Sequence, residues 1–507
     1  MILAAAGAHA GPDSDATANL LQIRVAAIRD GTPVEIAGER LASTVVLPEF
    51  YEGRGFRPAW SDRAARADLL SALRASRDDG LEPRDYHLAA IDSLARLAPG
   101  PQTDADLDLL ATDGVIRLAY HLRFGKVDAA TVEPDWEFTP AAEAAMSEPP
   151  EAALERAVEG RQVAAGLDSL RPRHWLYGAL RSALRQYRQI DSLGGWHNIP
   201  DGPVLKPGTA DPRLQALEKR LAIEGDLVTP PRADMGAYDT VLVAAMQRFQ
   251  QRHGLNPDGV VGPTSLQALN VPVTTRISQL RVALERGRLL LQELPERFVL
   301  VNIPAFRVLL VEDGRARLVS RVVVGKPFTQ TPSFRADMTY VTLNPSWTIP
   351  PSIVKRDVIP GMRKDPGYLE KKGYAKIGGQ YVQPPGPNNA LGQVKLMFPN
   401  PHHVYLHDTP NRELFANEAR TFSHGCIRVE NAVQLAQLLL EGQGDWDRGK
   451  MDEVMATNAT TSVTIERPLP ILIVYWTVSV GAAGDVRYAD DIYHLDAPLV
   501  EALDRRR

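Results

Sequence analysis

The sequence predicts a multidomain α+β protein with a helical scaffold, a small three-helix module and a mostly β domain that carries an insertion. Three observations support this prediction. The chain has 507 residues, more than one ordinary hydrophobic core accommodates, so several domains are expected. Apolar residues recur at helical spacing through the first half of the chain. From about Arg297, short apolar runs between turn residues indicate strands instead.

Composition excludes several classes of protein. The 57 Lys and Arg residues nearly balance 62 Asp and Glu residues, so no basic excess indicates nucleic acid as a partner. No window reaches the roughly 20 consecutive apolar residues of a membrane span, and we expect no transmembrane segment. A single cysteine cannot form an internal disulfide, and the low count is typical of an exported bacterial protein. Residues 1–12, with Ala8-His9-Ala10, are interpreted as a truncated signal peptide, the alternative being an accidental alanine-rich tail.

Residues 13–210 are expected to form a helical scaffold without catalytic spacing. An amphipathic helix includes Leu69 to Leu73 and ends at Gly80, and a second follows from Leu107 through Leu122. The proline-containing stretches 134–150 and 200–212 are interpreted as connectors. Nothing in this region indicates chemistry.

Residues 211–271 predict a compact three-helix module. Asp211 and Pro212 are expected to start its first helix, and a second helix spans about Thr240–His253. Periodicity alone identifies only a helical module, and most such modules are structural. Its residues nevertheless resemble the peptidoglycan-binding type 1 domain, which implies a cell-wall ligand; the matching positions are Phe249-Gln250, Gly254-Leu255, Asp258-Gly259 and Gly262. Residues 272–296 are expected to return as a helix to the scaffold.

Residues 297–480 are predicted to be mostly β, followed by a C-terminal tail at 481–507. Asp313-Gly314 is a strong hairpin signal between two apolar runs. The expected strands are Phe298–Ile303, Arg307–Glu312, Arg315–Val324, Thr339–Leu343, Leu396–Phe398, Val404–His407 and Val463–Val480. Pro468 and Pro470 should confine the last of these to an edge or a bend. Residues of about 352–395 lack periodicity and are expected to form an insertion that caps a site, with a helix near Ser352–Met362.

The strongest candidate for chemistry is Cys426, within Ser423-His424-Gly425-Cys426-Ile427-Arg428. A thiol attacks carbonyls as thiolate, and a neighbouring imidazole can take its proton and hold an ion pair; His407 and His424 are both candidates. Gly425 leaves room for a substrate carbonyl, and the N–H groups near Gly425 and Cys426 would form an oxyanion hole. Asn431 with Gln434 resembles a capping box, so the cysteine should lie on a turn between sheet and helix.

The run Ser-His-Gly-Cys-Ile-Arg-Val, with His-Asp-Thr-Pro upstream, resembles the catalytic motif of L,D-transpeptidases of the YkuD type. Val404 to Pro410 and Asn344 to Pro350 are similar to the large Gram-negative members, called YcbB-type. The resemblance implies a scaffold, a peptidoglycan-binding module and a catalytic domain with a capping insertion.

On this resemblance, Cys426 is the nucleophile, His407 is the base, and the carbonyl of Asp408 orients the imidazole. The remaining site residues would shape the oxyanion and acceptor region or the substrate wall; they are Ser423, His424, Gly425, Arg428, Trp347 and Tyr405. The implied reaction is ping-pong acyl transfer from a tetrapeptide donor with release of D-Ala, giving 3→3 cross-links. No cofactor is expected, carbapenems should acylate the cysteine, and the partners are peptidoglycan stem peptides, glycan and proteins of wall synthesis in a Gram-negative periplasm.

Two alternatives belong to other classes. A zinc-dependent wall peptidase would use ligands from His402, His403, His407, His424 and Cys426, with His403 and His407 on one strand face. We expect no metal, because neither a second cysteine nor a helical His-Glu-x-x-His accompanies them. A non-catalytic wall-binding protein would use the 211–271 module alone. Two residues keep an alternative role: Trp347 as a packing residue and Arg428 as the partner of a surface carboxylate. The acceptor can be a stem peptide, a lipoprotein or water.

Overall fold

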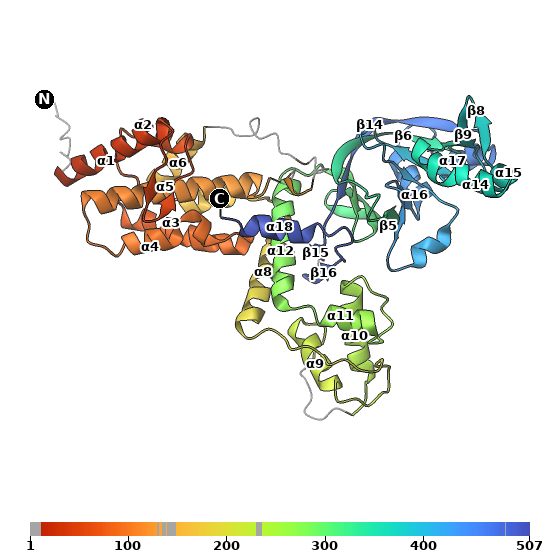
Figure 1. The fold of residues 1–507 in the computed structure, drawn as a ribbon, viewed down its shortest axis with the longest axis horizontal. Helices are drawn as coiled ribbons and strands as arrows, with labels where there is room; N and C mark the ends of the chain where they lie inside the picture. Colours follow the sequence, from red (N-terminus) through yellow and green to blue (C-terminus); the bar gives the residue numbers. More distant parts are fainter. Residues whose placement is uncertain are drawn as a thin grey trace.

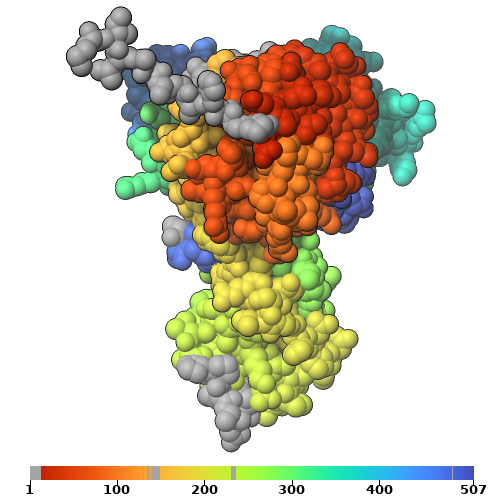
Figure 2. All heavy atoms as spheres, turned by 90° about the vertical axis from the view of Figure 1, so that its left-hand side faces the viewer, coloured from red at the N-terminus to blue at the C-terminus, as the bar shows by residue number. Residues whose placement is uncertain are grey.

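A computed structural model describes residues 12–128, 131–133, 138, 149–229, 236–481 and 483–506 of the chain. The molecule has a helical lobe at one end, a β-rich lobe at the other, and a smaller helical lobe that projects between them (Figure 1). Figure 2 shows this smaller lobe, of about residues 200–270, hanging clear of the scaffold. The predicted multidomain α+β class is confirmed. Ala8-His9-Ala10 and most of the 134–150 connector lie outside the described residues.

The first lobe is helical, as predicted. Its core packs Leu69 and Leu73 against Leu110 and Leu118, and Gly80, at φ 74°, ends the turn where the sequence predicted a stop. The helices are α1 (Pro12–Arg29), α2 (Val46–Gly53), α3 (Arg63–Ala75), α4 (Leu88–Leu94), α5 (Pro101–Phe124), α6 (Pro150–Glu159) and α7 (Val163–Ser169), with short 3-10 turns at Ser76–Asp79 and Pro83–Tyr86 and a small hairpin of β1 (Glu35–Ile36) and β2 (Glu39–Arg40). No helix among the described residues has both the length and the apolar character needed to cross a membrane.

Two long helices connect the lobes. Helices α8 (Trp175–Ser192) and α12 (Val273–Leu290) pack together, and their apolar residues share one core with the β-rich lobe. Tyr177 and Leu284, for example, belong to the same buried cluster as Phe298 and Trp476. The return helix therefore joins all three parts of the molecule.

The projecting lobe consists of α9 (Leu214–Ile223), α10 (Thr240–Arg252) and α11 (Pro263–Leu269). Helix α9 begins at Leu214, later than predicted, but the Asp211 carboxylate accepts the backbone N–H of Arg213 at 2.8 Å, the bond expected of a cap, and also binds the Arg213 guanidinium at 2.9 Å. Gln250 explains part of the module's sequence pattern. Its side-chain amide donates to Asp258 at 2.9 Å and its carbonyl accepts the Gly259 N–H at 2.8 Å, which fixes the loop before α11.

The β-rich lobe is a nine-stranded sheet in the order β12-β5-β13-β11-β10-β6-β14-β3-β4, and β4 also pairs with β5, so the strands close on themselves. At the predicted hairpin, Asp313 and Gly314 both have positive φ. The strands are β3 (Arg297–Asn302), β4 (Arg307–Glu312), β5 (Arg315–Gly325), β6 (Phe334–Leu343), β10 (Val394–Met397), β11 (Leu406–His407), β12 (Thr421–Ser423), β13 (Ile427–Val429) and β14 (Thr461–Val474). Helices α16 (Ala432–Leu440) and α17 (Arg448–Ala456) contribute to its core.

Two local predictions in this lobe need correction. β14 is an interior strand, and Pro468 is accommodated by a register shift between Thr464 and Leu469. Pro470 precedes Ile471, the first residue paired with β3, so its missing N–H leaves no gap in that ladder. Asn431 precedes α16 without a side-chain cap; its N–H donates to Ser320 Oγ at 3.0 Å instead.

The expected insertion separates β6 from β10. It begins at β7 (Trp347–Thr348) and confirms the helix near Ser352–Met362, which consists of α13 (Pro351–Ile353), a π-helical turn η4 (Val354–Val358) and α14 (Ile359–Lys364). Helix α15 (Tyr368–Lys372) and a small sheet of β7, β8 (Ala375–Ile377) and β9 (Gln380–Gln383) complete it.

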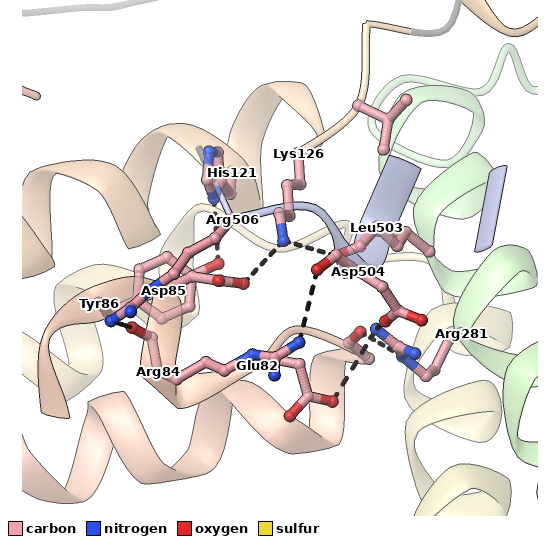
Figure 3. A network of polar contacts seen from close by, with 12 residues as sticks. Glu82, Arg84, Asp85, Tyr86, His121, Lys126, Arg281, Leu503, Asp504 and Arg506 are labelled. Atoms are coloured by element: carbon pink, nitrogen blue, oxygen red, sulfur yellow. Dashed lines mark hydrogen bonds and ion pairs between the residues drawn. The ribbon is translucent and has the colours of Figure 1, made fainter. Parts of the chain in front are cut away.

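The expected C-terminal tail is folded. It contains β16 (Val486–Tyr488), which pairs with β15 (Val478–Val480), and α18 (Asp496–Asp504). Helix α18 lies against the scaffold, where Lys126 donates to the Leu503 carbonyl at 2.5 Å and Asp504 pairs with Arg281 (Figure 3).

Candidate active site

Pairing of two short strands brings the predicted nucleophile and base together. β11 and β13 run parallel, with Leu406 opposite Ile427 and His407 opposite Arg428. Cys426 directly precedes β13, and the Ile427 N–H donates to the Tyr405 carbonyl at 3.1 Å. Because side chains alternate along strands and paired residues share a face, Tyr405, His407, Cys426 and Arg428 all lie on one face of the sheet.

The next strand adds a residue that sequence reasoning missed. Lys395 of β10 pairs with His407 and therefore shares this face. Its Nζ lies 4.0 Å from the centre of the Tyr405 ring, and burial lowers the pKa of its amine. Its sequence signal was weak: one charged residue between Val394 and Leu396, which are buried on the opposite face.

The sulfur of Cys426 is partly exposed and closely surrounded. Its thiol faces the His403 carbonyl at 4.0 Å, and the N–H and hydroxyl groups of Tyr405 lie near enough to the sulfur to favour its ionised form. Burial raises the pKa of the thiol, while the hydrogen bonds from Tyr405 and the charge of Lys395 oppose that rise. The resting sulfur is therefore a thiol. Tyr405 and the charge of Lys395 would stabilise its ionised form.

His407 is held as a neutral base. Its ring is 5% exposed, and Nδ1 donates to the Asp408 carbonyl at 2.5 Å, which leaves Nε2 unprotonated. Burial, and then the positive charges of Arg428 and Lys395, lower the pKa of the imidazole to about 3. A raised thiol pKa and a lowered imidazole pKa both favour the neutral pair over the ion pair expected from the sequence. No hydrogen bond joins the two side chains within the described part of the chain.

The turn before the nucleophile also differs from the expected oxyanion hole. Gly425 has φ 111°, a conformation that favours glycine. Its N–H donates to Ser423 Oγ at 3.1 Å and is therefore not available to a substrate oxygen. Its carbonyl accepts a hydrogen bond from Thr331 Oγ1 at 2.8 Å. Of the two amides predicted, only that of Cys426 has no acceptor among the described residues.

The other predicted residues lie around this face. His424 is exposed and its Nε2 accepts a hydrogen bond from Arg356 of the insertion at 2.5 Å. Burial, then the charge of Arg356, lowers the pKa of His424. Arg428 has no carboxylate within ion-pair distance in the described residues, so the predicted alternative of a surface pair is not observed. The Asp408 carboxylate pairs with Arg412 at 2.9 Å, away from the imidazole that its carbonyl orients.

Trp347 connects the insertion to the site. It lies in β7, near the Tyr405 hydroxyl, where burial and the neighbouring Cys426 raise the pKa of the hydroxyl and Trp347 opposes that rise. Its ring also contacts Tyr374 of the insertion, with centroids 6.2 Å apart. The two residues predicted as a substrate wall therefore lie near one another and near Cys426.

The zinc alternative lacks a ligand set. Among the described residues, no three His, Cys, Asp or Glu side chains gather closely enough to hold a metal ion. His403 lies in a turn with φ 55° rather than on the strand of His407, so the predicted shared face is wrong. His402 instead stacks near Phe334, with ring centroids 4.9 Å apart.

Three family models match the chain in the predicted order. Residues 46–184 match a scaffold domain, 210–269 a "Putative peptidoglycan binding domain", and 296–455 an L,D-transpeptidase catalytic domain. The chain thus combines three matched domains, of which two are a peptidoglycan-binding domain and a catalytic domain. The chain carries an L,D-transpeptidase catalytic domain of the YkuD type, which confirms the resemblance seen in the sequence.

Relatives agree over parts of the chain. A Haemophilus influenzae protein named "Putative L,D-transpeptidase" is 32% identical over 221 residues, 40% of this chain and 45% of that protein. The N-acetylmuramoyl-L-alanine amidase CwlL of Bacillus licheniformis is 35% identical over 68 residues, 13% of this chain and 19% of that protein. The matches span less than half the length of these curated relatives. The match to the structure of an L,D-transpeptidase from Stackebrandtia nassauensis covers 55% of this chain and 96% of that chain, at 14% identity and a TM-score of 0.23.

Proposed function

We propose that this protein is a periplasmic L,D-transpeptidase that forms 3→3 peptidoglycan cross-links through a thioester on Cys426. One observation carries the proposal. The chain's single cysteine and a buried imidazole with an unprotonated Nε2 occupy neighbouring strands on one face of the sheet. An acyl transfer needs this combination of nucleophile and base.

The neutral resting pair defines the first step. As the sulfur attacks the carbonyl between diaminopimelate and D-Ala, the thiol proton passes to His407 Nε2. The Cys426 N–H donates to the developing oxyanion, and the charges of Lys395 and Arg428 stabilise the negative charge near the sulfur. The C–N bond then breaks, the imidazolium gives its proton to the departing D-Ala amine, and the thioester remains.

A second stem peptide completes the reaction. Its side-chain amine loses a proton to His407 and attacks the thioester, and the returned proton restores the thiol. The 211–271 module supplies affinity for the polymer, which supports peptidoglycan as the substrate of the whole protein. Glycan and proteins of wall synthesis are the further partners we propose.

The decisive experiment follows D-Ala release and the intact mass of the protein with a disaccharide-tetrapeptide. The wild type should lose D-Ala from the donor, carry a thioester, and yield a 3→3 dimer, whereas Cys426→Ala should do none of these. His407→Gln should slow acylation by about 10³-fold. His197→Gln, the same change at an exposed histidine, is the matched control and should leave the rate unchanged.

Two results would overturn the proposal. Turnover in Cys426→Ala would exclude the cysteine. Retention of peptidoglycan by a wild type that shows no acylation by the tetrapeptide or by a carbapenem would favour the non-catalytic wall-binding alternative.

A further inference from the structure

A tyrosine from the C-terminal segment reaches the loop beneath the catalytic turn. Tyr493 is 5% exposed, and its hydroxyl donates to the Gly325 carbonyl at 2.7 Å and accepts the Thr331 N–H at 3.2 Å. Gly325 is the last residue of β5, and Thr331 lies in the connection that follows this strand. Tyr493 therefore ties a segment beyond the matched catalytic domain to a loop inside it.

Thr331 passes this constraint to the nucleophile. It is 2% exposed, and its hydroxyl accepts the Gly325 N–H at 3.0 Å and donates to the Gly425 carbonyl at 2.8 Å. The carbonyl of Gly425 and the N–H of Cys426 belong to the same planar peptide group. A hydrogen bond that orients that carbonyl therefore orients the N–H that we assign to the oxyanion.

Tyr493 is itself held from two sides. Its ring stacks on Tyr475 with centroids 5.5 Å apart, and its N–H donates to the Tyr475 hydroxyl at 2.8 Å. That hydroxyl donates to Asp491 at 2.7 Å, and Asp491 accepts the N–H groups of Leu495 and Asp496 at the start of α18.

The far end of α18 is anchored on the scaffold. Lys126 holds the Leu503 carbonyl, and Arg281 holds the Asp504 carboxylate at 2.9 Å (Figure 3). A continuous series of contacts thus leads from the scaffold through Tyr493 and Thr331 to the Gly425–Cys426 peptide.

We propose that Tyr493 is a positioning residue for acyl transfer, which acts through Thr331 to aim the Cys426 N–H at the oxyanion. The proposal rests on the proposed function of Cys426. The ring alone would satisfy the packing, since phenylalanine has the same shape. The hydroxyl is the group that positions the turn, through its hydrogen bonds to Gly325 and Thr331.

The test uses the full chain with Tyr493→Phe, Thr331→Val and the double variant. Each single change should lower kcat for D-Ala release about tenfold and leave KM within about twofold, because the oxyanion donor is misaimed only in the transition state. The double variant should be no slower than Thr331→Val, since both residues act in one relay. Thr331→Ser, which keeps the hydroxyl, should restore kcat.

Tyr51→Phe is the matched control. Tyr51 is also buried with a hydroxyl in two hydrogen bonds, to Asp108 at 2.6 Å and Thr112 at 2.8 Å, but it lies in the scaffold. It should lose comparable stability and keep kcat within about twofold. Tyr493→Phe with unchanged kcat, or losses that simply add in the double variant, would overturn the proposal.

Alkylation of the single cysteine separates this proposal from the proposed function. Iodoacetamide should modify Cys426 about threefold faster in Tyr493→Phe and Thr331→Val than in the wild type or Tyr51→Phe, because a released turn exposes the sulfur. A wild type that forms no acyl-enzyme would refute the proposed function and leave the alkylation rates to decide the positioning. Equal alkylation rates in all four proteins would refute the positioning.

Discussion

The environment of His407 keeps its imidazole neutral, as a general base requires. The same environment makes the folded protein less stable in acid. The ring is buried, its Nδ1–H is committed to the Asp408 carbonyl, and two cations share its face of the sheet. Its proton affinity in the folded protein is therefore far below that in the unfolded chain. In the reaction that we propose, a neutral pair depends on proton transfer during attack rather than on a thiolate held at rest.

This difference predicts an acid-dependent loss of stability. The pKa of His407 is about 3 in the folded protein and near its ordinary 6.5 when unfolded, so the unfolded chain binds a proton first as the pH falls. The stabilisation is present above pH 6.5 and is lost between about pH 6.5 and pH 3. The free energy of unfolding of the wild type, measured in urea, should fall between pH 7 and pH 4.5. In His407→Gln this fall should be about 2 kcal/mol smaller.

His197→Gln serves as the control, because His197 is exposed. This variant should lose as much stability between pH 7 and pH 4.5 as the wild type does. Parallel pH dependence in the wild type and His407→Gln would contradict the buried neutral imidazole.

At the scale of elements, the capping insertion is joined to the catalytic turn by an exposed contact. Arg356 of η4 donates to His424 Nε2, and Asp357 holds the same guanidinium at 2.9 Å. The imidazole accepts this bond only when Nε2 is unprotonated. Since the pKa of His424 is lowered, the contact persists at neutral pH and is lost on acidification below 6.5. The insertion is therefore a candidate lid over the donor peptide.

Hydrogen exchange across residues 352–395 tests this contact. Arg356→Ala should increase exchange about fivefold at pH 7.5, the effect of losing one hydrogen bond on a local opening equilibrium. The wild type should approach the variant at a second, lower pH, far enough below 6.5 for His424 to gain a proton. Arg363→Ala, at an exposed arginine of α14 in the same insertion, should exchange like the wild type. A variant that exchanges like the wild type at both pH values would show that the contact does not hold the insertion.

At the scale of the whole molecule, a buried charge cluster on α12 ties distant segments together. Arg286 pairs with Glu133 at 2.5 Å, between α5 and α6 of the scaffold, and with Asp496 at 2.6 Å, at the start of α18. All three side chains are buried, and Thr477 donates a further hydrogen bond to Asp496. The arginine is thus the common partner of segments that meet only in the folded chain.

Removing that partner should be costly. Arg286→Met leaves two buried carboxylates without a cation, and we expect a loss of about 3–5 kcal/mol in the free energy of unfolding. Arg317→Met is the control, because Arg317 also meets two carboxylates, Glu312 and Glu441, but on the surface, where its removal should leave the unfolding midpoint unchanged. Equal midpoints for the two variants would show that the cluster contributes no net stability.

The sequence by itself determined the features that depend on neighbouring residues. Asp313-Gly314 makes its hairpin because two positive φ angles suit those residues, and the loop before α11 follows from Gln250 and Asp258. The catalytic motif likewise identified Cys426 and His407 as the candidate pair. Local rules failed at Asn431, where a serine on a distant strand supplied the competing partner.

Only the tertiary structure decided how the site is tuned. Lys395 joins it through strand pairing, and Tyr493 bonds to Gly325 across 168 residues of sequence, so neither leaves a local signal. The neutral state of the pair also could not be predicted from the sequence, because the pKa values of Cys426 and His407 depend on burial and on charges from separate strands. Periodicity and turn chemistry act between near neighbours, whereas desolvation and long-range hydrogen bonds exist only once the chain has folded.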